Sequence, residues 1–148
     1  MGNKIQEEMT RLTKEDYPLG SKSSNLLFTT TGKAYDELNL DAALNGEINK
    51  NDLRISPKTL EMQAEISESL GREQLGKNFR RAAEMINLSD ARILEIYNAM
   101  RPNRSTKEEL LTIADELESE YGATENAKLI REAADVYERR GRLKEIED

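Results

Sequence analysis

From residue 39 onward, apolar residues recur every three or four positions, and residues that begin or end helices separate the runs. This period places apolar side chains on one face of a helix, whereas a strand would need them at every second position. The runs are Leu75, Phe79, Ala82, Ala83 and Ile86; Ile93, Ile96, Tyr97 and Met100; Leu110, Ile113, Ala114, Leu117 and Tyr121; and Ile130, Ala133, Ala134 and Tyr137. The pattern predicts an all-α, single helical domain over residues 39–148.

Residues typical of helix ends bound these runs. Asn39, Ser56 and Ser89 are N-cap candidates, and Ser105-Thr106-Lys107-Glu108 matches a capping box. Glycine or proline lies at the end of most of the predicted helices, at Gly46, Gly71, Pro102, Gly122 and Gly141. We therefore expect about five helices joined by short connections.

Residues 1–38 follow a different pattern and form a separate N-terminal part. Ile5, Met9 and Leu12 lie on one stripe of a short amphipathic helix, although a frayed terminus is the alternative. A helix of this length is marginal in water unless it lies on another surface.

Pro18, Gly20, Gly32 and a serine-rich run favour extended backbone over residues 16–38. Irregular segments of this length in compact domains usually bind something or are disordered. This one is too apolar for a solvated tail, so we expect an extended arm that lies along a partner protein. The residues expected to contact that partner are Tyr17, Pro18, Leu19, Leu27 and Phe28.

Missing residue types exclude several kinds of active site. The chain has no cysteine and no histidine, which excludes disulfides, thiolate nucleophiles, Ser-His-Asp triads and the usual zinc sites. No phosphate-binding glycine motif occurs. The carboxylate pairs Glu61/Glu65 and Glu116/Glu120 are assigned to solvated helix faces. We therefore expect no catalytic, cofactor-binding or metal-binding residue in this chain.

The charge pattern also restricts the partners. The net charge of −7 argues against nucleic acids and anionic membranes, both of which attract basic surfaces. The densest basic positions are Arg80-Arg81 and the pair Arg101 and Arg104. Arg101 and Arg104 are candidates for pairing with a partner's carboxylates, and the alternative is that Arg101 only complements a helix C-terminus.

Several segments together resemble the small (gamma) subunit of cobalamin-dependent diol and glycerol dehydratases. They are Asp16-Tyr17-Pro18-Leu19, Asn78-Phe79-Arg80-Arg81-Ala82-Ala83-Glu84, and residues 52–60, 92–102, 104–111, 113–118 and 130–134. They occur in the family's order and spacing over about residues 16–140.

The resemblance implies a complex of large, medium and small subunits, doubled into a dimer of heterotrimers. In that family the large subunit is a TIM barrel that holds the substrate and a metal ion, potassium or calcium. Adenosylcobalamin lies between the large and medium subunits. The small subunit is helical, packs on the large one and supplies no catalytic residue. The complex converts glycerol to 3-hydroxypropionaldehyde, or 1,2-propanediol to propionaldehyde, by radical dehydration.

Substrate preference and location stay open at this point. Only about 15 residues precede Asp16, which favours glycerol dehydratase, because diol dehydratases often have a longer extension. Ile5, Met9 and Leu12 nevertheless resemble the packaging helices of bacterial microcompartment proteins. The chain has no long apolar run, so we expect it in the cytoplasm or in a microcompartment. The rival hypothesis is a stand-alone helical adaptor with no enzyme partner.

Overall fold

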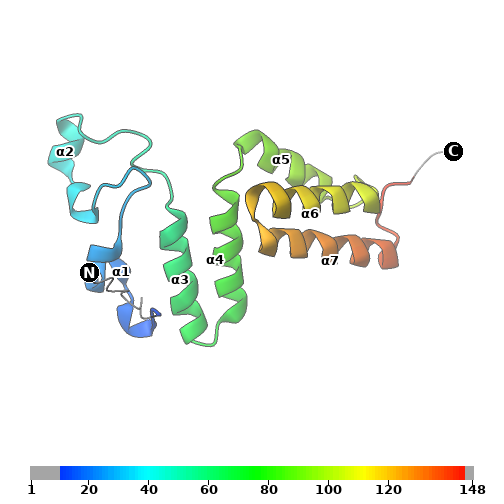
Figure 1. Cartoon of the computed structure of the whole chain (residues 1–148), viewed down its shortest axis with the longest axis horizontal. Helices are drawn as coiled ribbons and strands as arrows, with labels where there is room; N and C mark the ends of the chain where they lie inside the picture. Colours follow the sequence, from blue (N-terminus) through cyan, green and yellow to red (C-terminus); the bar gives the residue numbers. More distant parts are fainter. Residues whose placement is uncertain (1–10, 146–148) are drawn as a thin grey trace, which may run out of the picture.

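The computed structural model describes residues 11–145, which form helices and turns with one isolated β-bridge between Phe28 and Ala34 (Figure 1). The five longer helices are α3 (Pro57–Ser69), α4 (Glu73–Met85), α5 (Asp90–Ala99), α6 (Lys107–Tyr121) and α7 (Thr124–Arg140). They are preceded by two short helices, α1 (Leu19–Lys22) and α2 (Leu40–Leu44), and by 3-10 turns at Lys14–Asp16, Ser24–Leu26 and Tyr35–Glu37.

The all-α prediction is confirmed, but the expected number of about five helices is wrong, since residues 11–145 contain seven α-helices. The helix in the predicted arm, α1, has only four residues. Apolar periodicity cannot indicate so short a helix. Of the predicted N-terminal stripe, Ile5 and Met9 lie outside the described residues.

The ends of the longer helices largely follow the predicted caps. The Ser89 hydroxyl accepts from the Arg92 amide at the start of α5. Gly122 and Gly141 take left-handed backbone, with φ of 62° and 61°, where α6 and α7 end. The capping box of α6 is one residue later than expected, because Thr106 and Glu109 form it. The Ser105 hydroxyl instead donates to the Ala99 carbonyl.

Two helical hairpins make up most of the molecule, as Figure 1 shows. Helices α3 and α4 pack together, and α6 packs with α7. A small residue lets the first pair approach closely: a Cβ at Gly76 would lie 2.7 Å from Cγ of Glu68 on α3. Helix α5 lies beside the second pair and has no buried residue.

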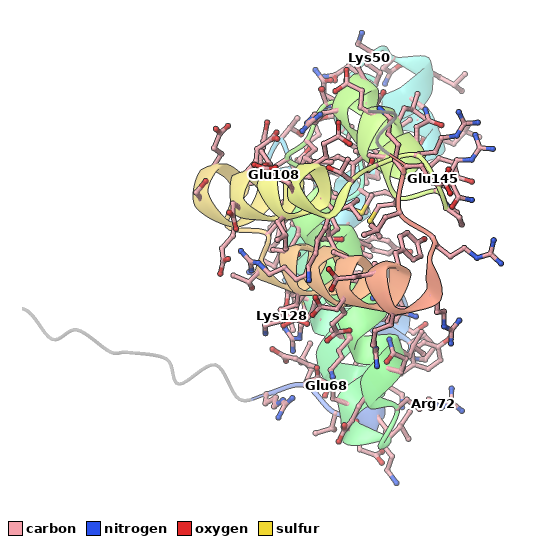
Figure 2. All side chains as sticks on the ribbon, turned by 90° about the vertical axis from the view of Figure 1, so that its right-hand side faces the viewer. Lys50, Glu68, Arg72, Glu108, Lys128 and Glu145 are labelled. Atoms are coloured by element: carbon pink, nitrogen blue, oxygen red, sulfur yellow. The ribbon has the colours of Figure 1, made fainter. Side chains whose placement is uncertain are left out.

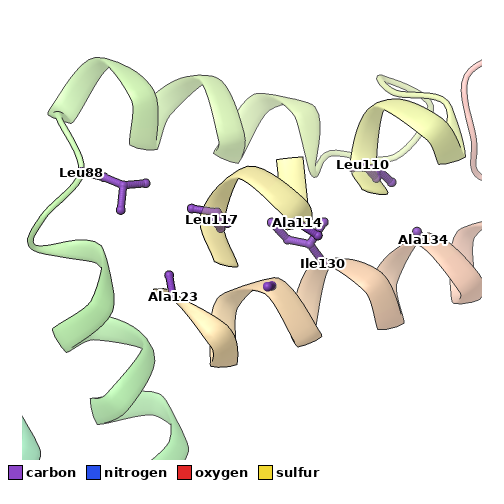
Figure 3. Packing of buried hydrophobic residues seen from close by; sticks show 8 residues of the cluster. Leu88, Leu110, Ala114, Leu117, Ala123, Ile130 and Ala134 are labelled. Carbon is purple, nitrogen blue, oxygen red and sulfur yellow. The ribbon is translucent and has the colours of Figure 1, made fainter. Parts of the chain in front are cut away.

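The described residues form two separate apolar cores. The larger core lies between α6 and α7 and is closed by Leu88, with Leu110, Ala114, Leu117 and Ile130 at its centre (Figure 3). The smaller core joins Met62 and Ile66 of α3 to the N-terminal part of the chain.

The N-terminal part supplies half of that smaller core, which corrects the prediction for residues 16–38. Leu19 and Leu27 are buried against α3 at 7% and 9% exposure. The segment is therefore a series of short turns folded onto its own domain, and not extended chain. The reason is that one-turn helices at Leu19–Lys22 and Ser24–Leu26 turn both leucines inward.

A carboxylate joins the two hairpins. Glu84 of α4 accepts from the backbone amides of Glu125 and Asn126 at 2.9 and 3.0 Å, which are unpaired donors at the start of α7. The N-cap residue of α7, Ala123, makes no side-chain cap. Glu84 thus caps α7 from another helix and fixes the angle between the hairpins.

Candidate partner-binding surfaces

The first uncovered apolar surface lies on the N-terminal part and is called the arm groove here. It is a hollow of about 350 Å³ whose apolar lining includes Phe28, Tyr35, Leu53, Ile55 and Leu60. Phe28 and Tyr35 are 45% and 47% exposed, and Leu53 and Ile55 are 70% and 65% exposed. Monomeric proteins seldom leave neighbouring large apolar side chains so exposed, so this surface is typical of a protein interface.

The walls of the arm groove are held by a buried carboxylate. Asp52 is 2% exposed and accepts from the Asn49 amide at 2.7 Å, from the Thr31 hydroxyl, and from Lys33 Nζ at 3.1 Å. The Asn49 amide first, then the Thr31 hydroxyl and Lys33, lower the pKa of Asp52 to about 2. Asp52 therefore stays ionised at neutral pH and fixes the 29–33 turn beside Leu53.

A second apolar surface, the hairpin groove, lies where α3 turns into α4. It is a hollow of about 540 Å³ lined by Tyr17, Ile66, Leu70, Leu75 and Phe79, together with polar side chains. Phe79 and Leu75 are on the predicted apolar face of α4, but both line this groove. Phe79 is half-exposed and Leu75 is exposed. The helical spacing correctly places both residues on the apolar face of α4. That face would be expected in the domain core, and for these two residues this expectation is wrong.

The third surface, the α5 groove, is the most apolar of the three. It is a hollow of about 270 Å³ lined by Met85, Ile93, Ile96, Tyr97 and Leu129 among others. Its polar lining residue, Asn126, is already hydrogen-bonded to Glu84 and to the Arg81 carbonyl. Tyr97 belongs to the predicted apolar stripe of α5, but it is 67% exposed because α6 and α7 cover only part of α5.

Basic side chains gather at the end of the molecule beyond α5, and we call this set the basic end: Arg101, Arg104, Arg140, Arg142 and Lys144. Two backbone hydrogen bonds bring its two segments together, from the Asn103 amide to the Arg142 carbonyl at 2.8 Å and from the Lys144 amide to the Ser105 carbonyl at 2.9 Å. Figure 2 looks onto this end and shows nitrogen-tipped side chains near Glu145.

The residues predicted to contact a partner are thus divided among separate places. Tyr17 is 64% exposed at the hairpin groove, and Phe28 lines the arm groove. Pro18 is exposed before α1, and Arg101 and Arg104 belong to the basic end. Leu19 and Leu27 are buried in the chain's own core, which leaves little of either side chain for a partner.

Sequence reasoning missed Leu53, Ile55 and Tyr35, which line the arm groove, and Leu94 and Tyr97 on the outside of α5. Leu53 and Ile55 lie in the connection before α3, and an apolar pair in a connection is the signal that could have indicated them. Leu94 lies off the predicted apolar stripe of α5, but nothing in the spacing separates the exposed Tyr97 from the covered residues of that stripe.

Of the two carboxylate pairs assigned to solvated faces, Glu120 is exposed as expected, but the other three carboxylates make structural contacts. Glu61 pairs with Arg80, Glu65 accepts from the Leu12 amide at 2.9 Å, and Glu116 pairs with Arg92. The bond to Glu116 is the main cause that raises the pKa of Arg92 above its usual range, and it ties α5 to α6. Among residues 11–145, no group of three carboxylates is arranged to hold a metal ion.

Comparison with known proteins gives a consistent family. A family model described as "Dehydratase small subunit" matches residues 12–144. The propanediol dehydratase small subunit of Salmonella typhimurium strain LT2 is 50% identical over 129 residues, which cover 87% of this chain and 75% of that protein. The propanediol dehydratase small subunit of Citrobacter freundii is 49% identical over the same shares. None of the described helices has the length and hydropathy needed to span a membrane.

Proposed function

Because the chain belongs to the dehydratase small-subunit family, we propose that it is the non-catalytic small subunit of an adenosylcobalamin-dependent propanediol dehydratase. In this proposal it packs on the large TIM-barrel subunit, within a dimer of heterotrimers that also contains the medium subunit. The whole complex converts 1,2-propanediol to propionaldehyde by radical dehydration. The names of the two relatives support 1,2-propanediol over glycerol as the preferred substrate.

The observation that carries the proposal is the match to the family over residues 12–144, nearly all of the described chain. The arm, hairpin and α5 grooves support it physically. Each leaves large apolar side chains in water, where burying them against another subunit would gain roughly 25 cal/mol per Å² of apolar area. Tyr17, Phe28 and the two arginines remain proposed contacts, while Leu19 and Leu27 act indirectly by shaping the arm.

The residues of this chain do not fit the cofactor. Potassium and calcium take oxygen ligands, and among residues 11–145 no group of three acidic side chains is arranged to hold a metal ion. The hollow of about 820 Å³ between α5 and α6 is lined by Thr106 and Glu109, whose polar groups already cap α6. We therefore assign adenosylcobalamin and the metal ion, potassium or calcium, to the other subunits, and no step of the reaction to this chain.

One observation favours the alternative, a stand-alone helical adaptor. That hypothesis expects residues 16–38 to be ordered without other chains, and the segment does pack on α3. The family match outweighs it, because an interface subunit can also fold before it assembles. Residence in the cytoplasm or in a microcompartment stays part of the proposal.

The test is a subunit-omission assay. The chain, the large subunit and the medium subunit are purified and combined with adenosylcobalamin and 1,2-propanediol. We expect no propionaldehyde from the chain alone and full activity only when all three are present. Equal activity with and without the chain would contradict a role in the dehydratase, and activity of the chain alone would contradict its non-catalytic role.

A further inference from the structure

Helix α5 has many large apolar residues, but the rest of the chain covers little of its surface. It carries Ile93, Leu94, Ile96 and Tyr97, yet none of its residues is buried, and Leu94 and Tyr97 are 62% and 67% exposed. A helix with this many large apolar residues normally loses most of its apolar surface to a neighbour. The ion pair from Arg92 to Glu116 holds α5 in place, so its exposed face is presented on a fixed support.

The lining of the α5 groove indicates what kind of side chain fits there. Met85, Ile93, Ile96 and Leu129 line it, and its polar residue, Asn126, is engaged with Glu84 and the Arg81 carbonyl. The Asn126 amide is therefore already satisfied, and the polar group left for an occupant is the Tyr97 hydroxyl at the groove. Apolar side chains match this groove, because a polar group placed there would lose its hydrogen bonds to water.

The basic end lies directly beyond the C-terminus of α5. In the part of the chain that the structure describes, none of its five cations forms an ion pair. Other exposed cations, such as Lys22 and Lys58, are also unpaired, but the basic end brings five of them together. The chain is acidic overall, with 29 acidic and 22 basic residues, so unpaired cations in one place stand out. The C-termini of α5 and α7 carry roughly half a negative charge each, and Glu145 lies at this end as well (Figure 2), so among the described residues the five cations still leave this end net positive.

We propose that the α5 groove and the basic end form one docking surface for a segment of the large dehydratase subunit whose apolar side chains fill the groove and whose carboxylates pair with Arg101 and Arg104. This inference rests on the proposed function and names the surface that it uses. The charge pattern selects the acidic partner: guanidinium groups bind carboxylates through two parallel hydrogen bonds. Tyr97 lies at the groove and suits an interface, since its ring packs while its hydroxyl finds a polar partner.

The test compares variants in their affinity for the purified complex of large and medium subunits. The variant Arg101→Glu/Arg104→Glu places like charges against the acidic segment, so we expect affinity to fall at least about tenfold. The variant Tyr97→Ala removes an anchor in the groove, and we expect a loss of about tenfold. Wild-type affinity should fall with rising salt, and the double variant should lose that dependence.

The control is Lys50→Glu/Lys77→Glu, which changes the net charge equally at exposed positions. Lys50 lies in the α2–α3 connection and Lys77 in α4, and both elements are away from the basic end (Figure 1). All four arginine and lysine side chains are exposed, so circular dichroism should show unchanged helicity and melting for both variants. Wild-type binding with unchanged affinity in the arginine and tyrosine variants overturns this surface and leaves the proposed function standing. A wild-type chain that does not bind at all overturns both.

Discussion

Asp52 is the one acidic side chain that is buried among residues 11–145, and its environment favours the charged form. Its pKa falls to about 2 through the Asn49 amide, the Thr31 hydroxyl and Lys33, whereas an unfolded aspartate titrates near pH ~4. A pKa that is lower in the folded state means that the carboxylate stabilises the fold above pH ~4. This stabilisation is lost as the pH falls toward about 2.

We expect Asp52→Asn to be less stable than the wild type at neutral pH, because the amide keeps the shape of the side chain and removes its charge. The variant should also show a smaller decline in stability between pH ~4 and pH ~2 than the wild type, because Glu68 and Glu125, whose pKa values are also lowered by their ion pairs, keep contributing. Thermal melting followed by circular dichroism from pH 2 to 7 measures both effects. A variant that shows the same acid profile as the wild type would assign that decline to other carboxylates.

Burial, more than residue type, sets the expected cost of core substitutions. Leu110 is 0% exposed, so Leu110→Ala should lower the free energy of unfolding by about 2–5 kcal/mol. Phe79 met the spacing of a core residue, but it lies half-exposed at the hairpin groove, so Phe79→Ala should cost less despite its larger side chain. Urea unfolding of both variants checks the order, and a larger loss for Phe79→Ala would show that the ring is buried.

At the scale of elements, Glu84 of α4 replaces a local cap for α7. Removal of its carboxylate in Glu84→Ala leaves the Glu125 and Asn126 amides without their acceptor and should cost about 0.5–2 kcal/mol, as for lost N-caps. Glu120→Ala, at an exposed position on α6, removes the same charge and should cost little. Chemical denaturation of both variants measures the difference, and equal stabilities would mean that α7 does not depend on this contact.

The longer helices could be predicted because their signals are local. Ser89 caps α5 and Gly122 ends α6 by contacts within a few residues, and the sequence shows both directly. Burial of Leu19 could not be predicted, because it depends on Met62 and Ile66, more than forty positions away. The Glu84 cap could not be predicted from the sequence for the same reason, since its acceptor and donors lie on different helices.

The candidate partner contacts also divide into those that the sequence predicts and those that it does not. Exposure of Tyr17 and Phe28 agrees with the sequence argument that the arm is apolar outside any helical stripe. The exposure of Tyr97 could not be predicted in the same way. The spacing of α5 shows that its apolar residues share a face, but it does not show how much of that face α6 and α7 cover.

At the scale of the whole molecule, two hairpins meet through α4 and α7, as Figure 1 shows. One core lies at the α6/α7 hairpin, and the other joins α3 to the N-terminal part. This arrangement gives much surface for little core, and apolar grooves lie along both halves. Such a shape suits a chain that completes its burial on a larger subunit, which is what the family of dehydratase small subunits implies.

Native mass spectrometry of the chain mixed with the purified large and medium dehydratase subunits tests this central claim most directly. We expect a complex that contains one copy of the chain for each large and each medium subunit. We also expect that residues around the arm, hairpin and α5 grooves exchange their amide hydrogens more slowly in the complex than in the free chain. A chain that stays monomeric in the presence of both subunits, with unchanged exchange at all three grooves, would contradict it.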